Sequence, residues 1–92
     1  LPNDPTKLIE GGISNQTHQV MKNLELVLDA AKSSFENVVF ARIYLLNFQD
    51  FDAMNAIYES YFMPDKLPAR TCIGVTGLAV GASVEIDLIA KL

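Results

Sequence analysis

One apolar stretch decides the fold of this chain of 92 residues: VVFARIYLL, at positions 38–46. It is short, rich in β-branched and aromatic side chains, and apolar at nearly every position. Such a run is typical of a strand in the middle of a sheet, because a strand with one face in water alternates apolar and polar residues. We therefore expect residues 38–46 to form a central strand that is buried on both faces.

An amphipathic helix is predicted on each side of this strand along the chain. Before it, a helix of about five turns begins near the N-cap residue Ser14 and repeats apolar or small side chains with a helical period. After it, Asn47 and Asp50 are candidate N-caps of a second helix that ends at Met63-Pro64. The apolar positions of the first helix are Val20, Leu24, Val27, Leu28 and Ala31. Those of the second are Phe51, Met54, Ile57, Tyr58, Tyr61 and Phe62, which we interpret as core packing.

Two more strands are expected in the last third of the chain, at residues 70–76 and 83–92. The segment between them, residues 77–81, is short enough for a hairpin that makes the two strands neighbours. In the last strand apolar and polar residues alternate, with Val84 and Ile86 on one face and Glu85 on the other. The order helix, strand, helix, strand, strand predicts an α+β fold with two helices on one face of a mixed sheet.

The motif PARTC, at positions 68–72, is the strongest candidate for a ligand site. Because side chains alternate along a strand, Arg70 and Cys72 share one face, and the residues between and after them share the other, which we assign to the core. A guanidinium is a permanently charged fork that suits a carboxylate or phosphate, and it is unfavourable without an anion beside an apolar core. From the residues alone, that anion is either an acidic side chain of the protein or a ligand. If the two last strands are neighbours, Glu85 lies on the same face and completes a polar pocket.

The charge balance argues against nucleic-acid binding. The chain has 7 lysines and arginines, scattered singly, against 11 acidic residues, which gives a net charge of −4. It therefore offers no basic patch for a phosphate backbone. No apolar run is long enough to cross a membrane. The single cysteine excludes an internal disulfide framework and favours a reducing compartment, for which we expect the cytoplasm, with the mitochondrion as the alternative.

The sequence predicts no metal site and no catalytic thiol. A zinc site needs a cluster of cysteines and histidines, and the chain has one residue of each kind. His18 falls in the first helix, where we expect it to face solvent, so Cys72 lacks the base that thiol catalysis needs. We therefore interpret Cys72 as a pocket wall. A domain of this size also gains burial by association, which favours an oligomer.

Several motifs, in the right order, resemble the reactive intermediate deaminase (Rid, or YjgF) family. The PARTC motif followed by residues 81–90, GASVEIDLIA, resembles the closing signature of that family, a PARS or PART strand, a turn and a VEIEAIA strand. Residues 23–28 resemble its first helix, and residues 37–45 are similar to its VVKATVFL strand. The segment from Phe51 to Phe62 resembles its second helix, including Asn55 and Tyr58. The resemblance extends over the chain from Leu1 to Leu92.

The resemblance implies a chorismate-mutase-like α+β fold that assembles as a homotrimer with ligand pockets at subunit interfaces. It implies hydrolysis of reactive 2-imino acids, such as 2-iminobutanoate or 2-iminopropanoate, or of their enamines, to 2-oxo acids and ammonia, without a metal or an organic cofactor. It further implies that Arg70 binds the substrate carboxylate, that Glu85 orients or activates the attacking water, and that Cys72 lines the pocket. Asn55 matches a family asparagine, which we interpret as structural or peripheral.

The chain departs from the family pattern at its start. Family members carry two strands before the segment that Leu1-Pro2 resembles, including an aromatic residue and a Ser-Gly-Gln segment that line the pocket. We therefore expect residues 1–92 to be a single Rid domain that lacks its N-terminal strands. Asp87 also stands where glutamate is usual. Two other functions stay open: a trimeric protein that binds a 2-oxo acid without turnover, and a ribonuclease, an activity attached to the family by name.

Overall fold

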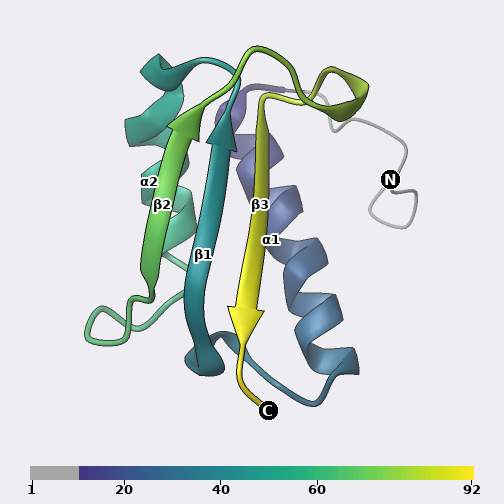
Figure 1. Cartoon of the computed structure of the whole chain (residues 1–92), viewed down its shortest axis with the longest axis vertical. Coiled ribbons are helices and arrows are strands. Elements are labelled where there is room, and N and C mark those ends of the chain that lie inside the picture. The colour runs from purple at the N-terminus through teal and green to yellow at the C-terminus, as the bar shows by residue number, and fades with distance from the viewer. Residues whose placement is uncertain (1–10) are drawn as a thin grey trace.

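A computed structural model describes residues 11–92, in which two helices lie against one face of a three-stranded sheet (Figure 1). The elements in chain order are α1 (Ile13–Ala30), β1 (Val38–Leu45), α2 (Phe51–Glu59), β2 (Ala69–Gly74) and β3 (Val84–Ala90). This arrangement confirms the predicted α+β class and the predicted element order. The expectation about Leu1-Pro2 lies outside the described residues.

The strand order is β2-β1-β3, so β1 is central as its apolar sequence predicts. β1 runs parallel to β2 and antiparallel to β3. The predicted hairpin between β2 and β3 is therefore wrong, because β1 lies between them, and residues 75–83 cross over its end instead (Figure 1). The physical reason is that β1 is the most apolar strand and pairs along both of its edges, and the link is long enough to span two strand spacings of about 4.8 Å each.

The core lies between the sheet and the two helices. Alternate residues of β1 face the helices, and Ala41, Ile43 and Leu45 are fully buried there. β3 adds Val84 and Ile86 to the same layer. From the helical side the buried residues include Met21 and Leu28 of α1 and Met54 and Tyr58 of α2.

The opposite, outer face of the sheet is uncovered in the described part of the chain. Arg42 projects from it, and Ile73 and Ile89 remain 45% and 54% exposed. The expectation that the central strand is buried on both faces is therefore wrong for a single chain. The apolar composition of β1 fits a doubly covered strand, but the helices cover only one side.

The helix ends differ in detail from the sequence prediction. α1 has the predicted five turns but its N-cap is Gly12 rather than Ser14, and Val27, expected in the core, is 64% exposed. Asn47 caps as expected, since its side chain accepts a hydrogen bond from the Gln49 amide at 3.0 Å, although the turn that it caps is a 3-10 turn ahead of α2. α2 ends at Glu59, before the predicted stop, so Tyr61 and Phe62 reach the core from the turn that follows.

Candidate functional site

The register of the sheet decides which way the PARTC motif faces. Arg70 lies beside Ala41, and Cys72 lies beside Ile43, in the parallel pair of β2 and β1. Ala41 and Ile43 are buried under the helices, and residues paired side by side share a face. Arg70 and Cys72 therefore face the helical layer and are half-buried, whereas Thr71 is exposed on the outer face. The assignment of the Thr71 side to the core was wrong, because alternation gives a period but not the face, which pairing with β1 sets.

Glu85 lies on the opposite side of the sheet from Arg70. Its neighbours Val84 and Ile86 are buried under the helices, and Glu85 itself is exposed and paired with Tyr44. The predicted pocket, with Arg70, Cys72 and Glu85 on one face, is therefore wrong for a single chain. The condition attached to it, that the last two strands are neighbours, is not met.

Arg70 is held by one face of α2. Its Nη1 donates a hydrogen bond to Asn55 Oδ1. The guanidinium carbon lies 5.3 Å from the centre of the Phe51 ring and 5.2 Å from that of Tyr58. Aromatic faces attract a cation at this distance and fix its plane, but they do not neutralise its charge.

No acidic side chain within residues 11–92 pairs with Arg70. The ion pairs in that range are Lys22 with Glu25 and Arg42 with Asp87. An arginine offers five N–H donors, and in the described chain Arg70 uses one of them on a neutral amide. Of the two anions left open by the sequence, an acidic side chain of residues 11–92 is therefore disfavoured. A half-buried guanidinium with donors to spare is suited to an anionic ligand.

Asn55 is more central than the sequence interpretation allowed. We expected a structural or peripheral residue, and the structure places its side chain on the guanidinium of Arg70. The sequence carried a signal for this, because Phe51, Asn55 and Tyr58 are spaced four and three residues apart and share one helix face. All three contact Arg70.

Cys72 is half-buried beside the core. Burial raises the pKa of its thiol, and the positive charge of Arg70 opposes that rise only in part. The thiol is therefore protonated at neutral pH and is a poor nucleophile. His18 does not assist it: as expected it is exposed on α1, and its Nδ1 lies 3.0 Å from Tyr61 Oη. The absence of a base beside Cys72 in the described chain agrees with the expectation of no catalytic thiol, and its role as a pocket wall stays a prediction.

Tyr58 places a neutral phenol against Arg70. Its side chain is 1% exposed, and its hydroxyl has no hydrogen-bond partner among the described residues. Burial raises the pKa of Tyr58 to about 12, although the charge of Arg70 acts in the opposite direction. A buried hydroxyl without a partner destabilises the fold by about 1–3 kcal/mol.

On the outer face near Glu85, polar side chains of β1 and β3 are hydrogen-bonded to each other. Arg42 Nε donates to Asp87 Oδ1 at 2.8 Å, and Tyr44 Oη donates to Asp87 Oδ2 at 3.4 Å. Asp87 raises the pKa of Arg42 through this hydrogen bond and through its charge. Asp87 is thus fixed by two partners, while Glu85, two residues earlier on the same face, has no side-chain partner in residues 11–92. Among the described residues, Glu85 is thus an exposed carboxylate of this surface without a partner.

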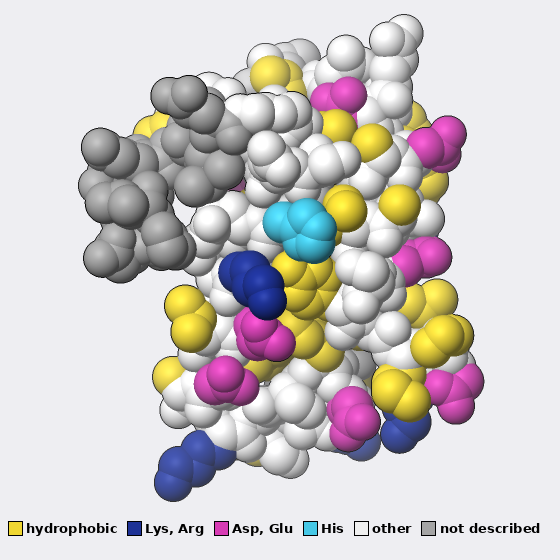
Figure 2. Space-filling view, turned by 180° about the vertical axis from the view of Figure 1, so that it is seen from behind, with side chains coloured by type: hydrophobic (Ala, Val, Ile, Leu, Met, Phe, Trp, Pro, Cys, Tyr) yellow, Lys and Arg dark blue, Asp and Glu magenta, His cyan; other side chains and the backbone are white. Residues whose placement is uncertain are grey.

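Three further features describe the surface and the helices. Among the described residues, no three histidine, cysteine, aspartate or glutamate side chains are grouped so as to hold a metal ion. None of the described helices has the length and hydropathy to span a membrane. The helical side of the molecule shows acidic side chains spread over its surface with few basic ones (Figure 2).

Comparison with known proteins gives concordant matches. The profile of a family described as Endoribonuclease L-PSP matches residues 1–92. The 2-iminobutanoate/2-iminopropanoate deaminase of Rattus norvegicus is 39% identical, over 95% of this chain and 64% of its own length. The putative regulator AldR of Lactococcus lactis is 38% identical, over 94% of this chain and 68% of its own length.

A solved structure agrees with these sequence matches. The Rid family protein YyfA of Yersinia pestis superposes with a TM-score of 0.90 at 37% identity, over 94% of this chain and 68% of that one. The chain thus spans about two thirds of the length of the proteins that it matches.

Proposed function

Because this chain belongs to the Endoribonuclease L-PSP family, the Rid or YjgF family of its sequence motifs, we propose that it is an imine or enamine deaminase. Its substrates are small 2-imino acids such as 2-iminobutanoate, and its products are 2-oxo acids and ammonia. The observation that carries the proposal is Arg70, a half-buried guanidinium that Asn55 and two aromatic rings hold without a carboxylate from the described chain. The rat relative named for this activity supports it.

Arg70 is the group that binds the substrate carboxylate. Its planar fork makes two parallel hydrogen bonds to a carboxylate, and partial desolvation strengthens both. Phe51 and Tyr58 limit the rotation of the guanidinium, so little side-chain entropy is lost when the ligand binds. Cys72, on the same face one pleat further along β2, lines the space beside it.

The two faces of the sheet lead us to propose a site shared between copies of the chain. Arg70 and Glu85 face opposite sides of one sheet, so a single copy does not bring both to one ligand. β2 is an edge strand of the described sheet, where a second copy has access. If that copy presents its outer face, its Glu85 meets the Arg70 of the first, and its exposed Ile73 and Ile89 become covered. A homotrimer repeats this contact three times in a closed ring.

The chemistry then needs only water. Water adds across the C=N bond: its oxygen bonds to the imine carbon while Glu85 accepts one proton and returns it to the nitrogen. Glu85 then carries the hydroxyl proton of the resulting carbinolamine to its nitrogen, the C–N bond breaks, ammonia leaves, and the C=O bond of the 2-oxo acid forms. No redox change occurs. Fixing the carboxylate at Arg70 and the water at Glu85 converts a two-body encounter into a positioned reaction.

A binding or regulatory protein is the second candidate, and the relative named as a putative regulator favours it. The same Arg70 site would then hold a 2-oxo acid, and Glu85 would not take part. A ribonuclease finds less support, since the chain carries a net charge of −4 and one histidine. Turnover separates the first two candidates.

The test combines binding and turnover for the full-length protein. Turnover of freshly generated 2-iminobutanoate is measured as release of ammonia, and binding of 2-oxobutanoate is measured by calorimetry. We expect Arg70→Ala to weaken binding about ten- to hundredfold, and Arg70→Lys to recover little, because an ammonium lacks the planar fork. Cys72→Ser is the control and keeps most of the activity. Binding without turnover in the parent would favour the regulator, and parent-like affinity in Arg70→Lys would exclude the two-point contact.

A further inference from the structure

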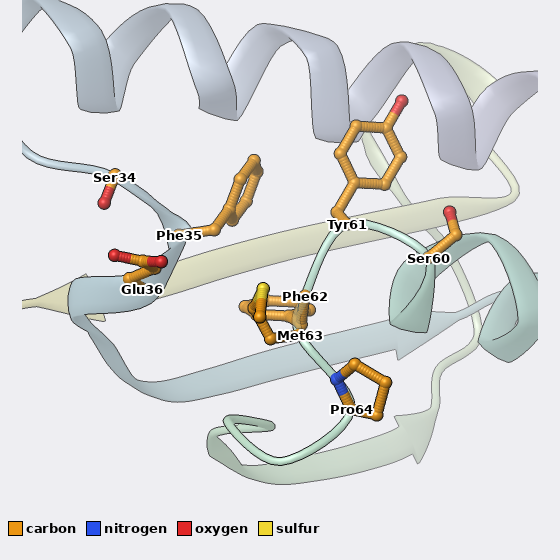
Figure 3. Close-up of a pocket in the computed structure, with 8 residues that line it drawn as sticks. All are labelled: Ser34, Phe35, Glu36, Ser60, Tyr61, Phe62, Met63 and Pro64. Atoms are coloured by element: carbon orange, nitrogen blue, oxygen red, sulfur yellow. The ribbon is translucent and has the colours of Figure 1, made fainter.

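A hollow of about 540 Å³ lies apart from Arg70, Cys72 and Glu85. One side is the segment just before β1, with Phe35 and Glu36, and the other is the turn that follows α2, from Ser60 to Pro64 (Figure 3). The two segments lie far apart in the sequence and face each other across the opening (Figure 3). None of the residues assigned to the deaminase site lines this hollow.

Three of the residues that line the hollow are aromatic: Phe35, Tyr61 and Phe62. The centre of the Phe35 ring lies 5.6 Å from that of Tyr61 and 5.2 Å from that of Phe62. Phe35 and Tyr61 are half-buried, so part of each ring remains open to a ligand, and Met63 at the rim is exposed. Ring faces carry partial negative charge and attract cations. The chain shows this attraction already, since Lys22 Nζ lies 5.7 Å from the centre of the Tyr61 ring.

The charged side chain of the hollow is also negative and therefore favours a cation, as the ring faces do. Glu36 is the one charged residue that lines it, and it has no ion-pair partner within the described chain. An anion is therefore disfavoured, and a neutral apolar ligand would leave the carboxylate of Glu36 without a counter-charge.

We propose that this hollow binds a small organic cation, an alkylammonium or quaternary ammonium group with a short apolar body. The charged group lies between the carboxylate of Glu36 and the rings of Phe35 and Tyr61. The apolar body packs on Phe62 and Met63. The site is independent of the deaminase proposal, since it uses none of the same residues.

The test is an NMR titration of amide resonances with two probes of the same shape, choline and its neutral analogue 3,3-dimethyl-1-butanol. We expect choline to shift resonances of residues 34–36 and 60–64 and to bind about three- to fivefold more tightly than the alcohol. Glu36→Gln should reduce that preference, leaving the part that the aromatic rings contribute, without changing the affinity for the alcohol. Glu36 is exposed, so the substitution leaves the core intact.

Asp52→Asn is the matched control, because it removes the same charge at the far end of α2, from an exposed residue that does not line the hollow. It should leave choline binding unchanged. Equal binding of the two probes, shifts outside the two lining segments, or an unchanged preference in Glu36→Gln would each overturn the proposal. Loss of choline binding in Asp52→Asn would also overturn it, because the effect would then be one of net charge alone.

Discussion

The two faces of the sheet differ in how their candidate site residues are held by the rest of the described chain. On the helical face Arg70 is half-buried, hydrogen-bonded to Asn55 and flanked by two rings. On the outer face Glu85 is exposed and has no side-chain partner in residues 11–92, although Asp87 beside it is held by Arg42. A preorganised cation on one side and a free carboxylate on the other indicate that the sheet divides the candidate site between them. Within residues 11–92 each face carries only part of the proposed site, and the shared-site proposal assigns the other part to a second copy.

The largest expected effect tests the role of the outer face. Glu85→Gln keeps the size and the hydrogen-bonding shape of the side chain but removes the base. Turnover of 2-iminobutanoate should fall by about two to four orders of magnitude, while binding of 2-oxobutanoate stays within about twofold. Glu59→Gln, an exposed carboxylate on α2, serves as the control. Full turnover in Glu85→Gln would move the catalytic role elsewhere.

Mixing two inactive variants tests whether the faces meet between copies. Arg70→Ala lacks the helical-face half of the site, and Glu85→Gln lacks the outer-face half. If each site takes one residue from each of two subunits, refolding or exchanging an equal mixture restores about one quarter of the parent sites. Each variant alone remains inactive. No recovery after exchange that mass spectrometry shows to be complete would place both residues in one chain and refute the shared site.

Sequence reasoning predicted what depends on local pattern. The apolar run of residues 38–46 gave the central strand, and helical periodicity gave both helices and the α+β class. Alternation also placed Val84 and Ile86 together in the core. In each case the information lies within one element, where the period of hydrophobic residues is set by the geometry of that element.

Two predictions about the site were wrong, the face on which Arg70 lies and the pairing of β2 with β3, and both failed for one physical reason. Alternation shows that Arg70 and Cys72 share a face but not which face the helices cover, and the length of a link does not fix whether its two strands pair. Both answers depend on β1 inserting between β2 and β3, which is a long-range event. The role of Asn55 was missed for a related reason, since its hydrogen-bond partner Arg70 lies on β2, fifteen residues further along the chain. The identity of Arg70 as an anion-binding candidate did follow from residue chemistry alone.

Tyr58 links the stability of the helical face to pH. It is buried beside Arg70, and its pKa is raised to about 12. The unfolded chain ionises tyrosine near pH 10, so stability from the protonated phenol is fully present below that pH and is lost as pH rises through 12. We expect the free energy of unfolding to fall by roughly 2–3 kcal/mol more between pH 10 and 12 in the parent than in Tyr58→Phe.

The measurement is urea unfolding of the parent and of Tyr58→Phe at a series of alkaline pH values. At neutral pH Tyr58→Phe should be as stable as the parent or slightly more so, because it removes a buried hydroxyl that has no partner in the described chain. If Tyr58→Phe kept the full alkaline loss, the ionisation of Tyr58 would not be its cause.

The smallest expected effect concerns the partner of Arg70. Asn55→Asp replaces a neutral acceptor of the guanidinium with a carboxylate of nearly the same shape, which supplies the anion that we assign to the ligand. A charge-assisted hydrogen bond should then raise the free energy of unfolding by about 1 kcal/mol. The same carboxylate competes with 2-oxobutanoate, so affinity for that ligand should fall about three- to tenfold. Asn23→Asp on α1 adds the same charge at a distance from Arg70 and should change neither quantity.

Thermal unfolding and calorimetry on the three proteins check both expectations. Unchanged affinity in Asn55→Asp would mean that the ligand does not depend on the free charge of Arg70, and the helical face would then lose its assigned role.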